Sequence, residues 1–202
     1  MFEPFPKLAR FSHDWTVTEK IDGTNGQIIV VRKGDPRLNP QIDGIIIETG
    51  DHYVMAGSRN RLLRPDNDNH GFAKFVADRA EEIVEKLGEG RHFGEWYGQG
   101  IGPRGYGVNP KRFALFNAGR WTGQELPDRF DVVPILFQGY LADAAIFDNQ
   151  LERLRLEGSR IAPGFMKPEG IVMYHGPSRT SFKKTFDYDE AGKWAEKQER
   201  NA

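Results

Sequence analysis

The sequence predicts an α+β fold in which mostly antiparallel sheets are flanked by helices. Short apolar, β-prone runs recur along the chain and are separated by segments rich in glycine, proline and asparagine. Longer stretches with apolar residues at helical spacing lie between and after these runs. No repeat, low-complexity tract or linker interrupts the 202 residues, so we expect one domain over 1–202.

The first half of the chain is expected to form strands followed by one helix. Each predicted strand is a short apolar run: 17–20, 27–32 and 44–48. A Gly-Thr-Asn-Gly turn is expected to join the first two strands, and an exposed loop precedes the third. A polar stretch with three arginines, 58–69, then leads to a helix over 72–87, which is predicted to end at Gly88.

The second half is expected to alternate strands with helices. The apolar runs predict strands at 92–97, 112–117, 132–137, 170–175 and 180–186. A loop with five glycines, 98–108, follows the first of them and is interpreted as a flexible active-site loop, because it lacks the Gly-Lys-Ser/Thr ending of a phosphate-binding loop. Amphipathic patterning predicts a helix at 141–156, and a charged helix is expected at 187–200.

Composition excludes several classes of site. The chain has no cysteine, which excludes disulfides, thiolate zinc sites and cysteine nucleophiles. A net charge of −1 gives no global basic field for nucleic acid, although 28 lysines and arginines leave room for a local basic groove. No apolar stretch approaches the roughly 18 residues of a membrane span. We therefore expect a cytoplasmic protein with no membrane partner.

Lys20 is the strongest candidate for chemistry. It ends an apolar, β-prone run and precedes the small residues Gly23 and Thr24, which would let a bulky ligand approach the backbone. A lysine amine is nucleophilic only when it is neutral, and neighbouring cations such as Arg59, Lys183 and Lys184 would favour that form. The alternative is an exposed lysine before a hairpin turn.

Other segments place single charged or aromatic residues on predicted strands. Glu95 lies in Phe-Gly-Glu-Trp-Tyr-Gly, Phe116 in Phe-Ala-Leu-Phe-Asn, and Glu169 in Pro-Glu-Gly-Ile-Val. The Glu95 carboxylate could point into a site, the Phe116 ring could stack on a purine, and Glu169 could hold a hard divalent cation. Lys183 and Lys184 could bind phosphate. The structural alternatives are a solvated glutamate, a core phenylalanine and a solvated edge strand.

Taken in order, these elements resemble the covalent nucleotidyltransferase superfamily of ATP-dependent DNA ligases, RNA ligases and mRNA capping enzymes. The order is Lys-x-Asp-Gly, an arginine, Gly-Glu-Trp, Phe-x-x-Phe-Asn, Glu-Gly-Ile-Val and Lys-Lys. The stretch 19–25 is most similar to the phage T4 RNA ligase 2 type of RNA ligase. The segment 133–139 also resembles one that these ligases carry, and the likeness runs from about Thr18 to Phe186.

The resemblance implies a fold and a set of nucleotide contacts. The fold would be a nucleotidyltransferase domain, an ATP-grasp-like ligase catalytic domain. ATP would transfer its AMP to Lys20, and Glu19 would contact the adenine edge. The remaining nucleotide-binding residues would serve the phosphates, the ribose and the base: Asn25, Arg59, Glu95 and Phe116.

The resemblance also implies a divalent cation and a cationic phosphate site. Glu169 would serve Mg²⁺ or Mn²⁺, and Lys183 and Lys184 would neutralise the phosphates. The family usually has Lys-x-Lys in this strand, whereas here the two lysines are adjacent. Adjacent strand residues point to opposite faces, so we expect one of them to face the site, and the sequence leaves open which.

The implied function is an ATP-dependent polynucleotide ligase that seals 3′-hydroxyl and 5′-phosphate ends of RNA or of a nicked duplex, and the likeness around Lys20 favours RNA. The alternatives are a DNA ligase, a GTP-using capping-type guanylyltransferase and a non-catalytic module that binds nucleotides or nucleic-acid ends. The 16 residues after Phe186 leave no room for an OB-fold or another C-terminal domain. We therefore expect either a minimal ligase or one that needs a protein partner for end recognition.

Overall fold

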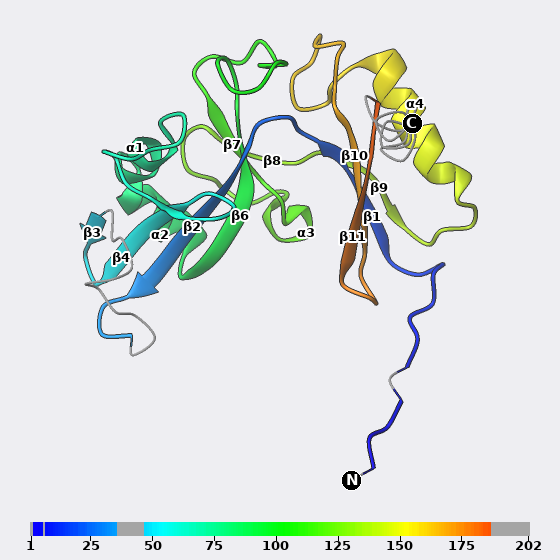
Figure 1. The fold of residues 1–202 in the computed structure, drawn as a ribbon, viewed down its shortest axis with the longest axis horizontal. Coiled ribbons are helices and arrows are strands. Elements are labelled where there is room, and N and C mark those ends of the chain that lie inside the picture. The colour runs from blue at the N-terminus through cyan, green and yellow to red at the C-terminus, as the bar shows by residue number, and fades with distance from the viewer. Residues whose placement is uncertain (1, 6, 36–46, 187–202) are drawn as a thin grey trace, which may run out of the picture. The chain divides into compact units, whose positions relative to one another are not determined.

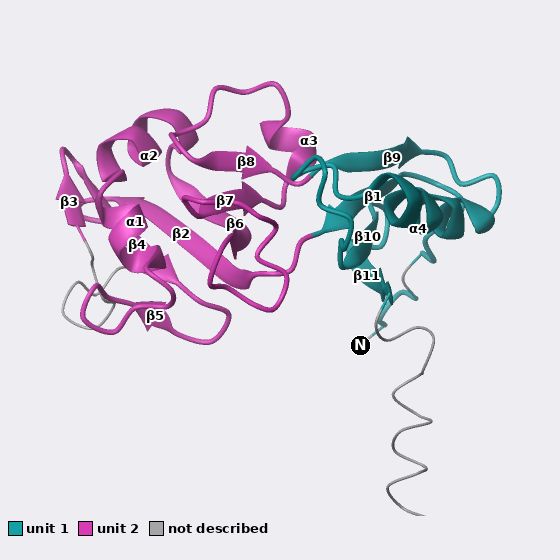
Figure 2. Ribbon diagram, turned by 90° about the horizontal axis from the view of Figure 1, so that it is seen from above, with its two compact units in different colours: residues 1–20, 134–202 teal, residues 21–133 magenta. Residues whose placement is uncertain are grey.

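A computed structural model describes residues 2–5, 7–35 and 47–186. The chain divides into two compact units, each built on its own sheet (Figure 2). Unit 1 joins the first 20 residues to the segment that starts at Pro134, and unit 2 runs from Ile21 to Val133. Antiparallel sheets flanked by a few helices make up both units, so the predicted α+β class is confirmed.

In its described residues, unit 1 is a four-stranded antiparallel sheet with one helix against it (Figure 1). In spatial order its strands are β11 (Thr180–Thr185), β10 (Gly170–His175), β1 (Trp15–Lys20) and β9 (Ile135–Gly139). Helix α4 (Ala145–Glu157) packs on one face, where alternate residues of β1 and β10 form a core with it. The buried members of that core are Trp15, Val17, Leu141, Leu154, Ile171 and Met173. The opposite face carries the intervening residues and is more exposed.

The described residues of unit 2 form a seven-stranded sheet and three helices. The strands are β2 (Thr24–Arg32), β3 (Ile47–Thr49), β4 (His52–Gly57), β5 (Leu62–Leu63), β6 (Gly90–Tyr97), β7 (Arg112–Leu115) and β8 (Phe130–Val132). Their order is β3-β4-β2-β6-β7-β8, with β5 paired to β4, and among these described strands only the β7–β8 pair is parallel. The helices are α1 (Phe72–Ala77), α2 (Ala80–Leu87) and α3 (Ala118–Trp121). Helices α1 and α2 share one hydrophobic core with residues of β2, β4, β6 and β7.

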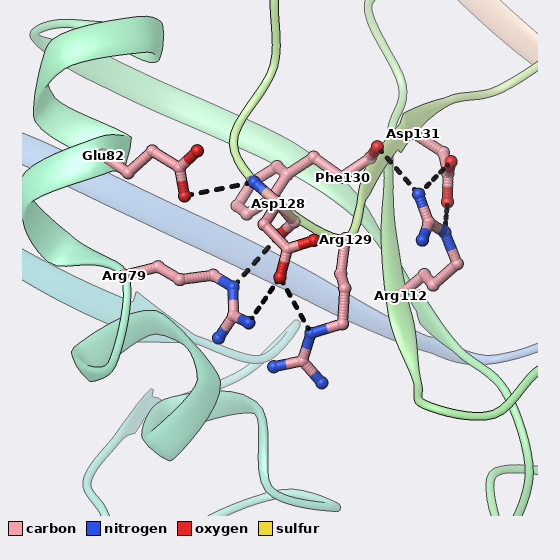
Figure 3. A network of polar contacts seen from close by, with 7 residues as sticks. All are labelled: Arg79, Glu82, Arg112, Asp128, Arg129, Phe130 and Asp131. Carbon is pink, nitrogen blue, oxygen red and sulfur yellow. Dashed lines mark hydrogen bonds and ion pairs between the residues drawn. The ribbon is translucent and has the colours of Figure 1, made fainter.

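A charged network ties β8 to the rest of unit 2 (Figure 3). Arg112 donates to both carboxylate oxygens of Asp131, at 2.6 and 2.8 Å, and the Tyr97 hydroxyl donates to the same carboxylate. Arg79, at the start of α2, contacts Asp128 at 2.8 Å, and Glu82 of α2 accepts from the Asp128 backbone N–H. Paired arginine–carboxylate contacts of this kind fix geometry as well as add binding energy. They hold the parallel edge of the sheet in register.

The predicted strand 132–137 is two strands in two different units. β8 ends at Val132 in unit 2, and β9 begins at Ile135 in unit 1. Pro134 stands at the break; it has no backbone N–H to donate to a sheet ladder. Its carbonyl accepts instead from Glu19 N–H at 3.0 Å, which attaches the start of β9 to β1. The run Val132–Phe137 was predicted as one strand because the residues on both sides of Pro134 are β-prone.

The predicted Gly-Thr-Asn-Gly hairpin turn is wrong. β1 pairs with β9 and β10 in unit 1, whereas β2 pairs with β4 and β6 in unit 2. Thr24, Asn25 and Gly26 already belong to β2. A Cβ at Gly23 would lie 2.4 Å from the Trp96 carbonyl oxygen, so the glycine permits the close approach of β6.

Other element boundaries also differ from the predictions. The helix predicted over 72–87 is two helices separated at Asp78–Arg79, and the second predicted helix begins at Ala145. Strand β4 was not predicted. The expected helix 187–200, and part of the expected loop and strand over 33–48, lie outside the described residues. Among the described helices, none is long and apolar enough to cross a membrane.

Candidate active site

Lys20 lies at the last position of β1, directly opposite Gly170 of β10. Glu169 immediately precedes β10, so the register brings its carboxylate to the lysine. Lys20 Nζ donates to Glu169 Oε2 at 2.6 Å, and the two side chains are 23% and 16% exposed. The structure thus brings together two residues that are 149 positions apart and that the sequence predicted for one site.

The register of β1, β10 and β11 assigns the two adjacent lysines to opposite faces of the unit 1 sheet. Lys183 lies opposite Val172, which lies opposite Thr18. Residues directly opposite one another share a face, and so do residues two apart in one strand. Thr18 and Lys20 are two apart, so Lys183 and Lys20 lie on the same face. This is the face that α4 leaves uncovered, and the Lys183 side chain is exposed there.

Lys184 belongs to the other face. It lies opposite Ile171, a buried residue of the core that α4 covers. Its Nζ forms an ion pair with Asp148 of α4. Lys184 therefore holds α4 against β11, and its predicted catalytic role is not supported by this placement.

Glu19 is also directed to the α4 face, away from Lys20. Its side chain is buried, and the residue is only 1% exposed. Its carboxylate accepts from Ser159 Oγ at 2.6 Å and from the backbone N–H groups of Arg160 and Ile161 at 2.7 and 3.1 Å. Both oxygens are engaged, so the expected contact of this side chain with the adenine edge is not supported. Glu19 instead attaches the segment after α4 to β1.

Burial dominates the titration of Glu19. Desolvation raises the pKa of its carboxyl above the ordinary value of 4.5, and the hydrogen bonds from Ser159, Arg160 and Ile161 oppose that rise. A buried carboxylate with three donors is stable only while all three are in place. The segment that follows α4 is therefore coupled to the residue next to Lys20.

Gly170 allows β11 to approach β10 closely. Its φ is +151°, a conformation that other residues rarely adopt, and a Cβ there would lie 2.2 Å from the Lys184 carbonyl oxygen. The Glu-Gly pair of the predicted motif therefore has two separate functions. Glu169 contacts Lys20, and Gly170 permits the strand pairing that carries Lys183.

In unit 2, Asn25 of β2 lies directly opposite Glu95 of β6. The neighbouring residues of β2, such as Ile28, point into the core formed with α1 and α2. Alternation along the strand therefore directs Asn25, and with it Glu95, to the face away from those helices. Both side chains are half-buried. A carboxylate and an amide on adjacent strands can together bind vicinal hydroxyls.

Two exposed aromatic rings lie on the same face of the unit 2 sheet. Phe93 is two residues before Glu95 in β6 and is 48% exposed, and Phe116 is 40% exposed. The Phe116 N–H donates to the Phe93 carbonyl at 2.9 Å, so the two residues continue the β6–β7 ladder. Gln27 lies opposite Phe93 in β2. The sequence prediction included Phe116 and missed Phe93 and Gln27, which the two-residue alternation around Glu95 and Asn25 could have indicated.

Arg59 is exposed in a turn that directly follows β4, where Ser58 and Arg61 are joined by a backbone hydrogen bond of 2.8 Å. It stands in unit 2 with Asn25, Glu95 and Phe116. Its predicted phosphate contact stays a prediction.

Asp22 of the Lys-x-Asp-Gly motif anchors the glycine-rich loop. Arg104 Nη1 contacts its carboxylate at 3.2 Å, and the Asp22 N–H donates to the Tyr106 hydroxyl at 2.9 Å. Ile101 and Tyr106 of the loop are buried. The loop, interpreted from sequence as flexible, is thus attached to the segment that follows Lys20. Sequence spacing gave no signal for this contact, since 82 positions separate Asp22 from Arg104.

The donor set is compatible with a hydrated magnesium or manganese ion. Within the described part of the chain, no group of three or more His, Cys, Asp or Glu residues could hold a metal by itself. Mg²⁺ commonly keeps several waters and binds one or two carboxylates together with substrate phosphates. Glu169 supplies one such carboxylate beside Lys20.

The unit 1 set therefore combines an amine, a carboxylate and a second cation on one exposed face. The amine can attack an electrophile, the carboxylate can accept a proton or bind a cation, and Lys183 can neutralise an anion. This combination suits transfer to or from a phosphorylated substrate, in which charge neutralisation and positioning dominate.

Comparison with protein families shows that the RNA ligase model matches residues 13–194. No protein of curated function matches the chain. Structures of Naegleria gruberi RNA ligase share the fold. A variant with ATP and Mn has 19% identity and a TM-score of 0.56, and covers 93% of this chain and 52% of its own. A second variant, with AMP and Mn, has 18% identity and a TM-score of 0.57, with coverage of 92% and 52%.

A third Naegleria structure, with pyrophosphate, has 18% identity and a TM-score of 0.54. It covers 94% of this chain and 52% of its own. The chain thus spans about half the length of the solved ligase chains that it matches. At these identities the likeness establishes the fold.

Proposed function

This chain belongs to the RNA ligase family, and we propose that it joins 3′-hydroxyl and 5′-phosphate ends of RNA in an ATP-dependent reaction through a lysyl-AMP on Lys20. The observation that carries the proposal is the 2.6 Å contact between Lys20 and Glu169, on the sheet face that Lys183 shares. Lys183 on the same face supports the proposal, because its cation could neutralise a nucleotide phosphate.

In the proposed first step, the neutral Lys20 amine attacks the α-phosphorus of ATP. A P–N bond forms, the bond from the α-phosphorus to the bridging oxygen breaks, and pyrophosphate leaves with the electron pair. The lysine must first lose a proton, and Glu169 Oε2 at 2.6 Å is close enough to accept it. Lys183 would then neutralise phosphate charge as the leaving group departs.

A divalent ion, Mg²⁺ or Mn²⁺, would be held by Glu169 and substrate oxygens and would supply further charge neutralisation at the phosphates. Glu19 would take no part in this chemistry. We assign it as a positioning residue, because it fixes the end of β1 by three hydrogen bonds.

For unit 2, the resemblance and the shared sheet face support roles in nucleotide binding. Glu95 would accept hydrogen bonds from the ribose hydroxyls, with Asn25 beside it near the phosphates. Phe116 would stack on adenine, since an exposed ring offers an apolar face to a base. Arg59 would contact the phosphate or ribose.

In the later steps, the AMP on Lys20 would pass to a 5′-phosphate end, which breaks the P–N bond and forms a pyrophosphate linkage. The 3′-hydroxyl of the other end would attack that activated phosphate and expel AMP. The products are a phosphodiester bond and AMP, so each seal would consume one ATP.

Covalent labelling tests the proposal. Incubation with α-labelled ATP and Mg²⁺ or Mn²⁺ should give a labelled protein band that survives denaturation, and Lys20→Ala should abolish it. Lys74→Ala, which removes an exposed lysine of α1, is the matched control and should label as the wild type does. A wild-type protein without a band, or a labelled Lys20→Ala protein, would contradict the mechanism.

The nucleotide and the strand chemistry are tested separately. Labelling by GTP instead of ATP would identify a guanylyltransferase, and binding without labelling would identify a non-catalytic module. Nicked duplexes with RNA or DNA on each side of the nick should be sealed only where the ends are RNA. Self-labelling without sealing would indicate that a partner protein supplies end recognition.

A further inference from the structure

A groove in unit 1 lies between the start of β9 and the second half of α4. Its volume is about 390 Å³, within the usual range for small-molecule sites. Pro134, Ile135 and Leu136 line it from the β9 side, and Gln150, Arg153 and Leu154 line it from α4. Arg160, in the segment after α4, completes the lining. Because β9 is an edge strand of the described sheet, no further described strand closes this side.

The groove combines apolar walls with an excess of positive charge. Ile135 and Leu136, which are half-buried, provide the apolar part, whereas Leu154 is only 2% exposed and belongs to the core. Arg153 and Arg160 share a single carboxylate, that of Glu157, at 3.4 and 2.6 Å. Their side chains are 52% and 47% exposed, so both guanidinium groups are accessible to a ligand.

This charge balance selects among phosphate ligands. Two guanidinium groups against one carboxylate leave one positive charge, which matches the single negative charge of a phosphodiester. A nucleoside triphosphate would bring several negative charges to a site that already contains Glu157. Arginine forks bind phosphate oxygens in a bidentate manner, and apolar walls suit the face of a base. The chemistry therefore fits one nucleotide of a strand better than free ATP.

The groove is also connected directly to the residue beside Lys20. The Pro134 carbonyl accepts from the Glu19 N–H at 3.0 Å, and the Arg160 N–H donates to the Glu19 carboxylate at 2.7 Å. Two residues that line the groove are thus hydrogen-bonded to Glu19. A ligand seated there contacts the segments that fix the end of β1.

We propose that this groove binds one nucleotide of a single-stranded RNA segment, with its phosphodiester at Arg153 and Arg160 and its base on the apolar wall. The choice of RNA rests on the proposed ligase function. The groove would hold a strand near its end while chemistry takes place at Lys20, and it is a site additional to the one that would bind ATP.

Fluorescence anisotropy with a labelled uridine hexamer tests the site. The hexamer lacks a 5′-phosphate and so cannot be a ligation donor. Arg153→Ala and Arg160→Ala should each weaken binding about tenfold at low salt, because each removes a charge-assisted contact with the phosphodiester. Arg155→Ala is the matched control, since Arg155 is on the same helix, pairs with Glu152 and does not line the groove. Equal affinities for all three variants and the wild type would overturn the proposal.

A second measurement locates the strand independently of these variants. A hexamer containing 4-thiouridine should crosslink on irradiation to peptides that contain residues 134–136 or 150–160 of the wild-type protein. Crosslinks confined to other peptides would overturn the proposal. Competition by ATP for the same crosslink would also overturn it, because the groove would then be a mononucleotide site.

The same variants distinguish failure of this site from failure of the ligase mechanism. Covalent labelling of Lys20 by ATP, without RNA, should remain within about twofold of the wild type in Arg153→Ala, since Arg153 touches neither Lys20 nor Glu19. If labelling persists while hexamer binding is unchanged by the arginine variants, the groove proposal fails and the mechanism stands. If hexamer binding falls as expected in a protein that never labels, the mechanism fails and the groove stands.

Discussion

The two faces of the unit 1 sheet carry similar charged residues in opposite environments. On the uncovered face, Lys20 contacts Glu169 and shares an exposed surface with Lys183. On the face that α4 covers, the neighbours of these residues, Glu19 and Lys184, are bound to the helix or to the segment after it. The comparison indicates that adjacent residues of one strand serve different purposes: one set is available for chemistry, and the other fixes the sheet that presents it.

The largest expected effect is on the rate of labelling, and it should follow from removing Lys183, the exposed lysine on the face of Lys20. Lys183→Ala should reduce labelling by α-labelled ATP at least about 100-fold, because a preorganised cation at a phosphate contributes several kcal/mol to transition-state stabilisation. The rate of labelling in single-turnover experiments is the measurement. A rate within threefold of the wild type would show that Lys183 has no catalytic role, although it shares a face with Lys20.

The next largest effect concerns Glu19 on the covered face. Glu19→Ala should lower the free energy of unfolding by about 3 kcal/mol, since three donors lose their acceptor in a buried environment. Urea denaturation measures this loss. Glu157→Ala, which removes an exposed carboxylate from α4, is the control and should cost under about 1 kcal/mol. Equal losses in the two variants would contradict the structural role of Glu19.

The free energy of unfolding should depend on pH through the ionisation of the Glu19 carboxyl group. Burial raises the pKa of Glu19 above 4.5, so the folded protein retains this proton at a pH where the unfolded chain has lost it. The resulting stabilisation is fully present below about pH 4.5 and is lost as the pH rises through the folded-state pKa. Urea midpoints across this range should therefore fall more in the wild type than in Glu19→Gln. Parallel pH profiles would argue that burial does not control this group.

The smallest effect is expected for Lys184. Lys184→Ala should leave the labelling rate within about threefold of the wild type and reduce stability by less than about 1 kcal/mol, because its partner Asp148 is 65% exposed. Single-turnover labelling and urea denaturation, run beside Lys183→Ala, measure both quantities. A labelling loss as large as that of Lys183→Ala would mean that the face assignment derived from the strand register is wrong.

Local patterns were sufficient where the relevant information was local. The apolar runs around Val17 and Ile28 predicted strands that the structure contains, and the order of six short motifs predicted the fold class that the comparisons confirm. The predictions failed where strand pairing with segments far away in the sequence determines the local structure. Thr24, Asn25 and Gly26 of the turn expected at 23–26 belong to β2 because β6 pairs there, and Val132–Phe137 is divided between two sheets at Pro134.

The candidate site shows the same contrast between features that depend on local sequence and features that depend on contacts between distant segments. The sequence predicted Lys20, Glu169 and Glu95 as site residues, because their residue types stand in a recognisable order. It could not identify the Glu19 hydrogen bonds, the exposed ring of Phe93 or the contact of Arg104 with Asp22, since each depends on which segments the fold brings together.

The sequence by itself determined that this protein has a lysine at a strand end, followed in a fixed order by the carboxylates, aromatics and cations of a ligase-type domain. It also determined that Lys183 and Lys184 must face opposite ways, because side chains alternate along any β-strand. Only the tertiary structure decided which of the two shares a face with Lys20. That choice depends on the register of β11 against β10 and on the face that α4 covers, and both are fixed by pairing and burial between segments far apart in the chain.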